Sequence, residues 1–74
     1  MMSGFISYLN NRENYGYITG YDDERYYFEF SSLNFSTSLL KQDLEVLFDP
    51  NQNGLMLYAL DIKLLKDNCP IVLI

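Results

Sequence analysis

The sequence predicts an all-β domain built as one small closed barrel of five strands. Short runs rich in β-branched and aromatic residues alternate with turn clusters at roughly even spacing, which is typical of a barrel or sandwich. Both prolines, Pro50 and Pro70, fall outside these runs, as strand assignments require. The runs are too few to cover two large sheets, whereas a curled sheet fills its interior with side chains and leaves few exposed edges.

The runs follow one another with a polar cluster after each. Residues 4–9 (GFISYL) are closed by NNREN, and residues 15–21 (YGYITGY) are closed by DDE. Residues 25–30 (RYYFEF) lead into a connection rich in Ser, Thr and Asn, which has room for one helical turn. Residues 44–48 (LEVLF) end at the turn cluster DPNQNG, and residues 55–65 (LMLYALDIKLL) form the last run.

Alternation in the second and third runs predicts an outer face that carries tyrosines. Side chains of a strand point to opposite faces in turn, so Tyr15 and Tyr17 share one face, and Tyr27 shares a face with Glu29. A carboxylate is rarely buried without a partner, so the face with Glu29 is the outer one. We therefore expect these four side chains at the surface and the residues between them in the barrel.

Composition supports one small domain over residues 1–65. Nearly half of the residues, 49%, are apolar and 16% are aromatic, enough for a single core of marginal size. Residues 66–74 (KDNCPIVLI) form an apolar C-terminal extension. We expect it to be an extra strand packed on the barrel, with a dimer edge or the start of a larger protein as alternatives. The chain is then a monomer, or a weak homodimer through this extension.

Several function classes are disfavoured by what the chain lacks. Cys69 is the one cysteine, which excludes an intrachain disulfide and a cysteine-cluster metal site and suits a reducing compartment. There is neither a signal-peptide pattern nor an apolar run long enough to span a membrane, so we expect a cytoplasmic protein with no membrane partner. With no histidine, nucleophilic catalysis has no visible base, and we expect no enzyme and no cofactor.

Two acidic segments are candidate metal sites. DPNQNG matches the first half of a calcium loop, but Leu60 stands where the last acidic ligand belongs. Asp22, Asp23 and Glu24 have no histidine to pair with and fit a solvated turn. The sequence therefore predicts turns at both places and no metal.

The runs together resemble a cold-shock domain over about residues 4–65. GFISYLN stands where that family has G-x-V-K-W-F-N, ENYGYI matches its first RNP motif, K-G-F-G-F-I, and YYFEFS matches the second, V-F-V-H-F-S. LEVLF fits the fourth strand and ALDI fits A-x-N-V. Order, spacing and residue classes agree in every segment. The resemblance implies an OB-type barrel of five antiparallel strands that binds single-stranded RNA or DNA.

The resemblance also implies which rings contact bases. Tyr15 and Tyr17 fall on the two stacking phenylalanines of the first motif, and Tyr27 falls on a stacking phenylalanine of the second. Phe30 is the next aromatic, and Tyr8 takes the place of an exposed tryptophan. Alternation alone turns Tyr8 and Phe30 inward, so for these two residues periodicity and resemblance disagree.

Other positions of the implied surface depart from the family. Glu29 replaces a histidine, where it repels a phosphate but can accept a hydrogen bond from the amino group of cytosine or guanine. Glu13 replaces a lysine, although the adjacent Arg12 can reach the same phosphate. Phe35 corresponds loosely to an aromatic that caps the binding groove. Asn14 replaces a glycine, and asparagine tolerates a left-handed backbone.

Charge opposes the binding of a polyanion. Ten acidic and five basic residues give a net charge of −5, whereas affinity for nucleic acid comes largely from cations that displace counterions. Stacking, at about 1–3 kcal/mol per base, must then supply most of the affinity. The sequence predicts a non-catalytic single-strand binder that acts as an RNA chaperone does. The alternative is an acidic OB module that has lost this role and binds a protein partner through its tyrosine patch.

Overall fold

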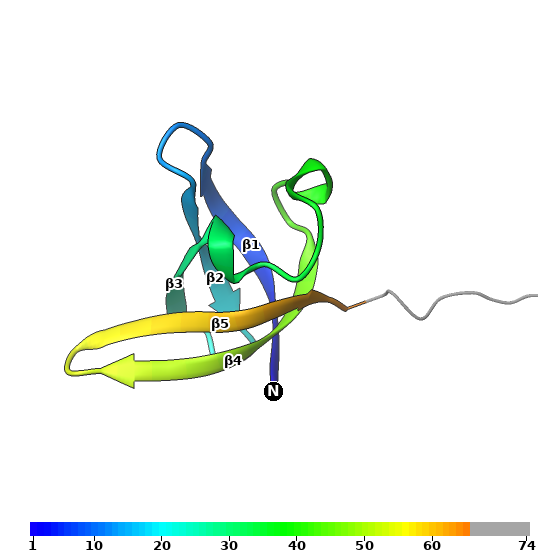
Figure 1. Ribbon diagram of the computed structural model, residues 1–74. Helices are drawn as coiled ribbons and strands as arrows, with labels where there is room; N and C mark the ends of the chain where they lie inside the picture. Colours follow the sequence, from blue (N-terminus) through cyan, green and yellow to red (C-terminus); the bar gives the residue numbers. More distant parts are fainter. Residues whose placement is uncertain (66–74) are drawn as a thin grey trace, which may run out of the picture.

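Five strands close into a barrel in the computed structural model, which describes residues 1–65 (Figure 1). They are β1 (Met2–Asn10), β2 (Tyr15–Gly20), β3 (Arg25–Glu29), β4 (Glu45–Asn53) and β5 (Met56–Leu64). Around the barrel they follow the order β1-β2-β3-β5-β4, and β4 pairs back with β1. The predicted all-β barrel of OB type is confirmed. The proposed packing of residues 66–74 lies outside the described residues.

Four of the five strand pairings are antiparallel, as expected for this barrel. The closing pair β3–β5 runs parallel, with Tyr27 opposite Tyr58. The connection between β3 and β4 holds two short 3-10 helices, η1 (Phe30–Ser32) and η2 (Thr37–Leu39), which provide the expected helical turn. Among residues 1–65, no helix has the length and apolarity needed to cross a membrane.

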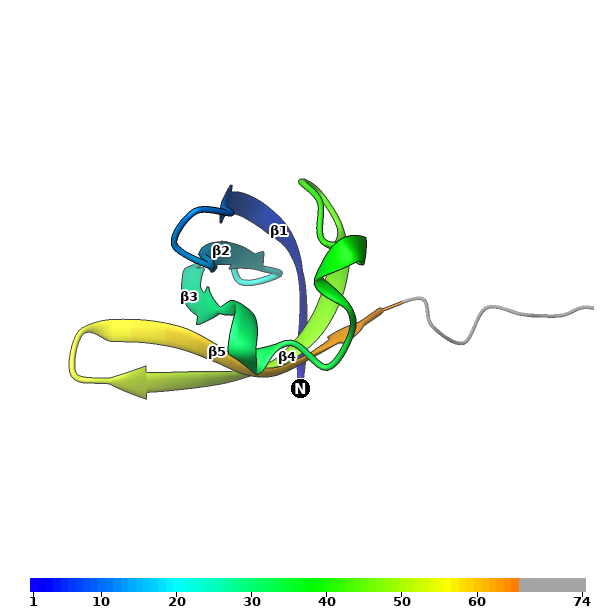
Figure 2. The ribbon, with the colours of Figure 1, turned by 45° about the horizontal axis from the view of Figure 1, so that its top comes forward.

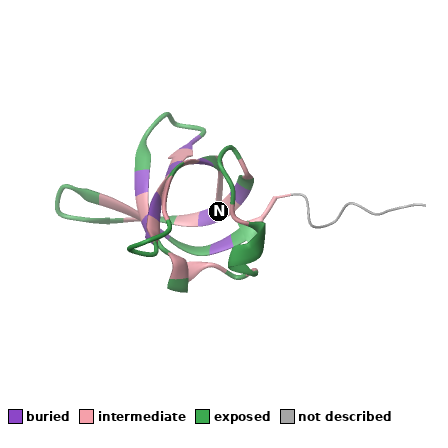
Figure 3. Ribbon diagram, turned by 90° about the horizontal axis from the view of Figure 1, so that it is seen from above, coloured by how far each residue is buried: buried purple, intermediate pink, exposed green. Residues whose placement is uncertain are grey.

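The core consists of inward-facing side chains from all five strands. These are Ile6, Ile18, Tyr26, Phe28, Val46, Phe48, Ala59 and Ile62. Seen from above, buried segments alternate with more exposed ones along the strands that form the ring (Figure 3). The alternation predicted for the second and third runs is therefore observed, because closing the barrel leaves each strand one interior face.

A β-bulge in β1 reverses the direction of Tyr8. Ile6 pairs with Ile18, but Tyr8 pairs with Tyr17, so Ser7 is one extra residue on β1. An extra residue shifts every following side chain to the opposite face. Tyr8 consequently lies on the outer face and is 43% exposed. The conflict between periodicity and resemblance at Tyr8 is resolved in favour of an outward ring.

The β4–β5 hairpin is longer than the sequence predicted. The cluster at residues 49–53 continues β4 instead of forming the turn, which lies at Gly54 and Leu55. The hairpin reaches beyond the barrel in both views (Figures 1 and 2). The expectation that Pro50 lies outside any strand was wrong. Pairing of β4 with β1 ends at Phe48, so Pro50 stands on an open edge, where a missing N–H breaks no ladder bond.

Stability is expected to decrease at alkaline pH through Tyr26. The hydroxyl of the core residue Tyr26 donates a hydrogen bond of 2.7 Å to Asp22 Oδ2. Burial, followed by this hydrogen bond, raises the pKa of Tyr26 to about 12, and the same bond lowers the pKa of Asp22. Since the folded-state pKa of Tyr26 exceeds its ordinary value of 10.0, the linked stability is complete below that pH and is lost as pH rises towards 12.

Urea unfolding at a series of pH values tests this dependence. The free energy of unfolding should decline across this alkaline window in the native chain, and the decline should be smaller in Tyr26→Phe, which has no hydroxyl proton to lose. An equal decline in both proteins would show that Tyr26 does not titrate differently on folding.

Candidate functional site

Four tyrosine rings from three strands lie together on the outer face of the barrel. This tyrosine cluster consists of Tyr8 on β1, Tyr15 and Tyr17 on β2, and Tyr27 on β3. Ring centroids are 5.6 Å apart for Tyr15 and Tyr27, and about 6 Å apart for the other contacting pairs. These distances are typical of aromatic contacts. The sequence-predicted outer face therefore forms one continuous aromatic surface.

Strand register explains why the rings meet. Tyr8 pairs with Tyr17 across β1–β2, and Tyr17 pairs with Tyr27 across β2–β3. Side chains of directly paired residues point to the same face, close enough to touch. On β5, Tyr58 pairs with Tyr27 and is buried only in part.

Sequence reasoning missed Tyr58. Its signal was the alternation of β5, in which Ala59 faces the core and the residue before it must face outward. The sequence did not indicate that β5 pairs with β3, because this parallel pairing joins residues far apart in the chain.

Arg25 lies directly over one ring of the tyrosine cluster. Its guanidinium carbon is 4.5 Å from the centroid of the Tyr17 ring, within the range of a cation–π interaction. Arg25 begins β3 and pairs with Thr19, which brings its side chain over the neighbouring strand. The aromatic surface therefore has a positive charge next to Tyr17.

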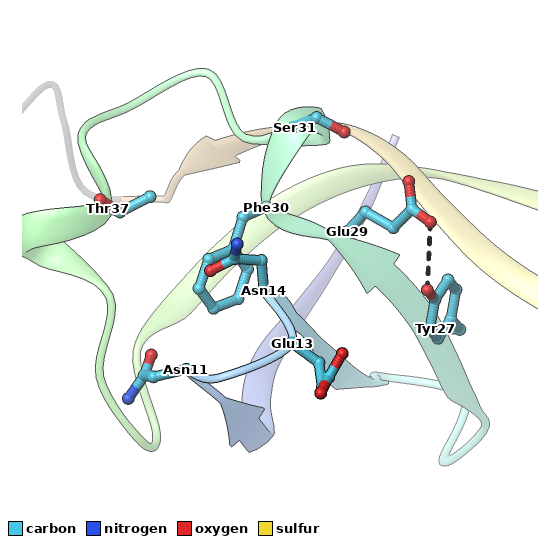
Figure 4. Close-up of a pocket in the computed structure, with 8 residues that line it drawn as sticks. All are labelled: Asn11, Glu13, Asn14, Tyr27, Glu29, Phe30, Ser31 and Thr37. Atoms are coloured by element: carbon cyan, nitrogen blue, oxygen red, sulfur yellow. Dashed lines mark hydrogen bonds between the residues drawn. The ribbon is translucent and has the colours of Figure 1, made fainter.

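Glu29 borders the tyrosine cluster next to Tyr15 and Tyr27. It pairs with Tyr15 across β2–β3, and its Oε2 accepts a hydrogen bond of 3.2 Å from the Tyr27 hydroxyl (Figure 4). Burial, with a further contribution from this hydrogen bond, raises the pKa of Tyr27 above its ordinary value. The Tyr27 hydroxyl therefore stays protonated at neutral pH and remains a donor to the carboxylate.

An open hollow of about 710 Å³ adjoins the cluster beyond Tyr27 (Figure 4). It is lined by Asn11, Glu13, Asn14, Tyr27, Glu29, Phe30, Ser31 and Thr37. Glu13, Glu29 and Tyr27 lie toward one end of the hollow, and Asn11 and Thr37 lie toward the other (Figure 4). Hydrogen-bonding groups thus surround a space that opens from the aromatic surface.

Phe30 borders this hollow as well as the core. It begins η1 instead of continuing β3, and its ring stacks on Phe28 at 6.1 Å with 22° between the planes. It is half-buried and packs against the core. Alternation predicts an inward side chain, which agrees with its packing against the core. The resemblance implies a position at the surface, which agrees with its place at the border of the hollow.

The remaining sequence-predicted residues do not join the tyrosine cluster. Arg12 is exposed in the turn between β1 and β2, where its backbone N–H donates to Asn10 Oδ1 at 3.1 Å. Asn14, in the same turn, has a φ of 61°, so the expected left-handed backbone is confirmed. Phe35 is half-buried and packs against the core.

Comparison with known proteins identifies the fold. Among 39 matching chains of solved structures is Drosophila Unr CSD456, which contains cold-shock domains 4 to 6. The two chains superpose with a TM-score of 0.76 and are 25% identical, and the match covers 95% of this chain and 29% of that chain. Neither a protein-family model nor a curated protein sequence matches.

Proposed function

The chain is a cold-shock-like domain, and on that premise we propose that it binds single-stranded RNA or DNA without catalysis. The observation that carries this proposal is the tyrosine cluster, in which rings from three strands are presented together at the surface. Every nucleobase has a π-face, so a row of exposed rings binds unpaired bases with little dependence on sequence.

Stacking supplies most of the affinity in this proposal. Arg12 and Arg25 near the cluster are balanced by Glu13 and Glu29, so the surface has no net positive field to attract a polyanion. The guanidinium of Arg25 lies over the Tyr17 ring, so a base that stacks there takes its place, and the displaced side chain can contact a neighbouring phosphate. The surface therefore provides one or two ionic contacts and several aromatic ones.

The cellular activity we propose is that of an RNA chaperone. Bases that stack on protein rings cannot stack on each other, and a strand held in this way cannot pair with a second strand. Binding on an open surface needs no covalent step and no cofactor. A strand is released when a competing duplex becomes more stable than the protein complex.

Titration of a dye-labelled seven-nucleotide pyrimidine strand, followed by fluorescence anisotropy, tests the proposal. The single strand should bind, and the same strand annealed to its complement should bind much more weakly, because stacking within a duplex covers the base faces. If neither form binds at high micromolar protein and low salt, the proposal fails. The tyrosine patch would then be assigned to the alternative function, a protein partner.

Binding is expected to depend only weakly on salt. With one or two phosphate contacts, the slope of log K against log salt concentration should be about −1, since each contact contributes about −0.7 on a single strand. The anisotropy titration repeated across a salt series measures this slope. A slope of about −3.5 or steeper would require five or more ionic contacts and would contradict an affinity based on stacking.

A further inference from the structure

We infer that Glu29 makes this surface prefer guanine over the other bases. This inference rests on the proposed function and adds to it the identity of one recognised base. It concerns the region where the tyrosine cluster meets the hollow, at Tyr15, Tyr27 and Glu29.

Glu29 is placed beside the two rings that lie closest to each other. It is the cross-strand partner of Tyr15 and follows Tyr27 by two residues on the same face of β3. The Tyr15 and Tyr27 rings are 5.6 Å apart with only 31° between their planes, the smallest tilt within the tyrosine cluster. A flat base that lies on this pair has its edge within reach of the carboxylate.

The carboxylate is held in place but keeps acceptor capacity. One hydrogen bond, from the Tyr27 hydroxyl to Oε2, fixes the direction of the group. A carboxylate has about four lone-pair sites on two oxygens, so Oε1 and a second position on Oε2 stay available. Glu29 is exposed, so the edge of a base can approach its carboxylate from solvent.

Guanine is the base whose edge matches such an acceptor. Its Watson–Crick edge presents two neighbouring donors, N1–H and the 2-amino group, which fit the two oxygens of one carboxylate as a bidentate pair. Adenine and cytosine place a ring-nitrogen acceptor beside their amino group, and uracil and thymine have one N–H between two carbonyl oxygens. Each of these bases brings a lone pair toward the carboxylate.

The charge around the hollow keeps the phosphate backbone on the opposite side. Glu13 and Glu29 both line the hollow and lie toward its Tyr27 end (Figure 4), so a phosphate is repelled there. The guanidinium of Arg25 lies instead over Tyr17. A strand is therefore oriented with its backbone toward Arg25 and with one base edge toward Glu29.

The experiment uses the full chain and a set of labelled seven-nucleotide thymidine strands that differ only at the central base. A central guanine should bind about tenfold more tightly than a central adenine, cytosine or thymine, the usual size of discrimination by a bidentate contact. A central hypoxanthine, which keeps N1–H but lacks the 2-amino group, should lose most of this advantage.

Glu29→Gln should remove the guanine preference, because its amide offers one acceptor and one donor in place of two acceptors. Strands without a central guanine should bind somewhat more tightly to this variant, since a repelling charge is gone. Glu24→Gln is the matched control. Glu24 lies in the exposed turn before β3, and this variant makes the same charge change while the preference should stay intact.

The outcomes separate the two proposals. If all strands bind but guanine has no advantage, or if Glu29→Gln keeps the advantage, this inference is overturned and single-strand binding stands. If no strand binds, both fail together. A guanine advantage that disappears in Glu29→Gln and persists in Glu24→Gln supports it.

Discussion

Replacing Tyr15 and Tyr17 together by alanine is expected to weaken single-strand binding strongly. Each ring belongs to the tyrosine cluster, and each contacts the Tyr27 ring. A stacked base contributes about 1–3 kcal/mol, so losing two stacking positions weakens binding by a factor of about 25 or more. The anisotropy titration measures this loss, and circular dichroism checks that the barrel remains folded.

Two control variants make this result specific. Tyr15→Phe with Tyr17→Phe retains both rings and should bind close to the native affinity, because stacking needs the ring and not the hydroxyl. Tyr21→Ala removes a tyrosine that is 75% exposed in the turn after β2, outside the cluster, and should have little effect. Native binding by the double alanine variant would show that bases do not stack on β2.

Gly16→Ala is expected to destabilise the barrel strongly although it adds only one methyl group. A Cβ on Gly16 would lie 2.4 Å from the Tyr8 carbonyl oxygen and 3.0 Å from the Phe28 ring. Neither a strand backbone nor a buried ring can move aside easily. Overpacking of this kind typically costs about 1–3 kcal/mol, which is a large part of the stability of a small domain. Urea unfolding measures the loss.

Gly54→Asn is the matched control for Gly16→Ala. Gly54 has a φ of +65° and open space where a Cβ would lie, and asparagine tolerates this backbone conformation. The control should unfold at nearly the native urea concentration. If Gly16→Ala did so as well, the close approach of β1 and β2 at this position would be incorrect.

The sequence was sufficient to predict the direction of those site residues that alternate strictly along a strand. Tyr15, Tyr17, Tyr27 and Glu29 face outward as predicted, because a closed core allows each strand one inward face and a shift by one residue would bury the wrong set. Pairing residues of β2 and β3 are close in sequence, so their register follows from one short turn.

Features that depend on a distant partner could not be predicted in the same way. Residues 49–53 have the composition of a turn, so the sequence did not indicate that β4 continues through them. Pairing with β5 stabilises this part of the strand. In β5 the register also shifts opposite Phe48, where Asp61 has a φ of 55° and accepts a hydrogen bond from Asn34. No local pattern marks these contacts, because their stabilisation comes from residues elsewhere in the chain.

The bulge at Ser7 has a consequence for how such surfaces evolve. Tyr8 reaches the outer face only because β1 has one residue more than β2 between the Ile6–Ile18 and Tyr8–Tyr17 pairs. A deletion at that point would keep every aromatic residue in the gene product and still turn one ring into the interior. Related chains with the same tyrosines can therefore differ in the width of their aromatic surface through strand length alone.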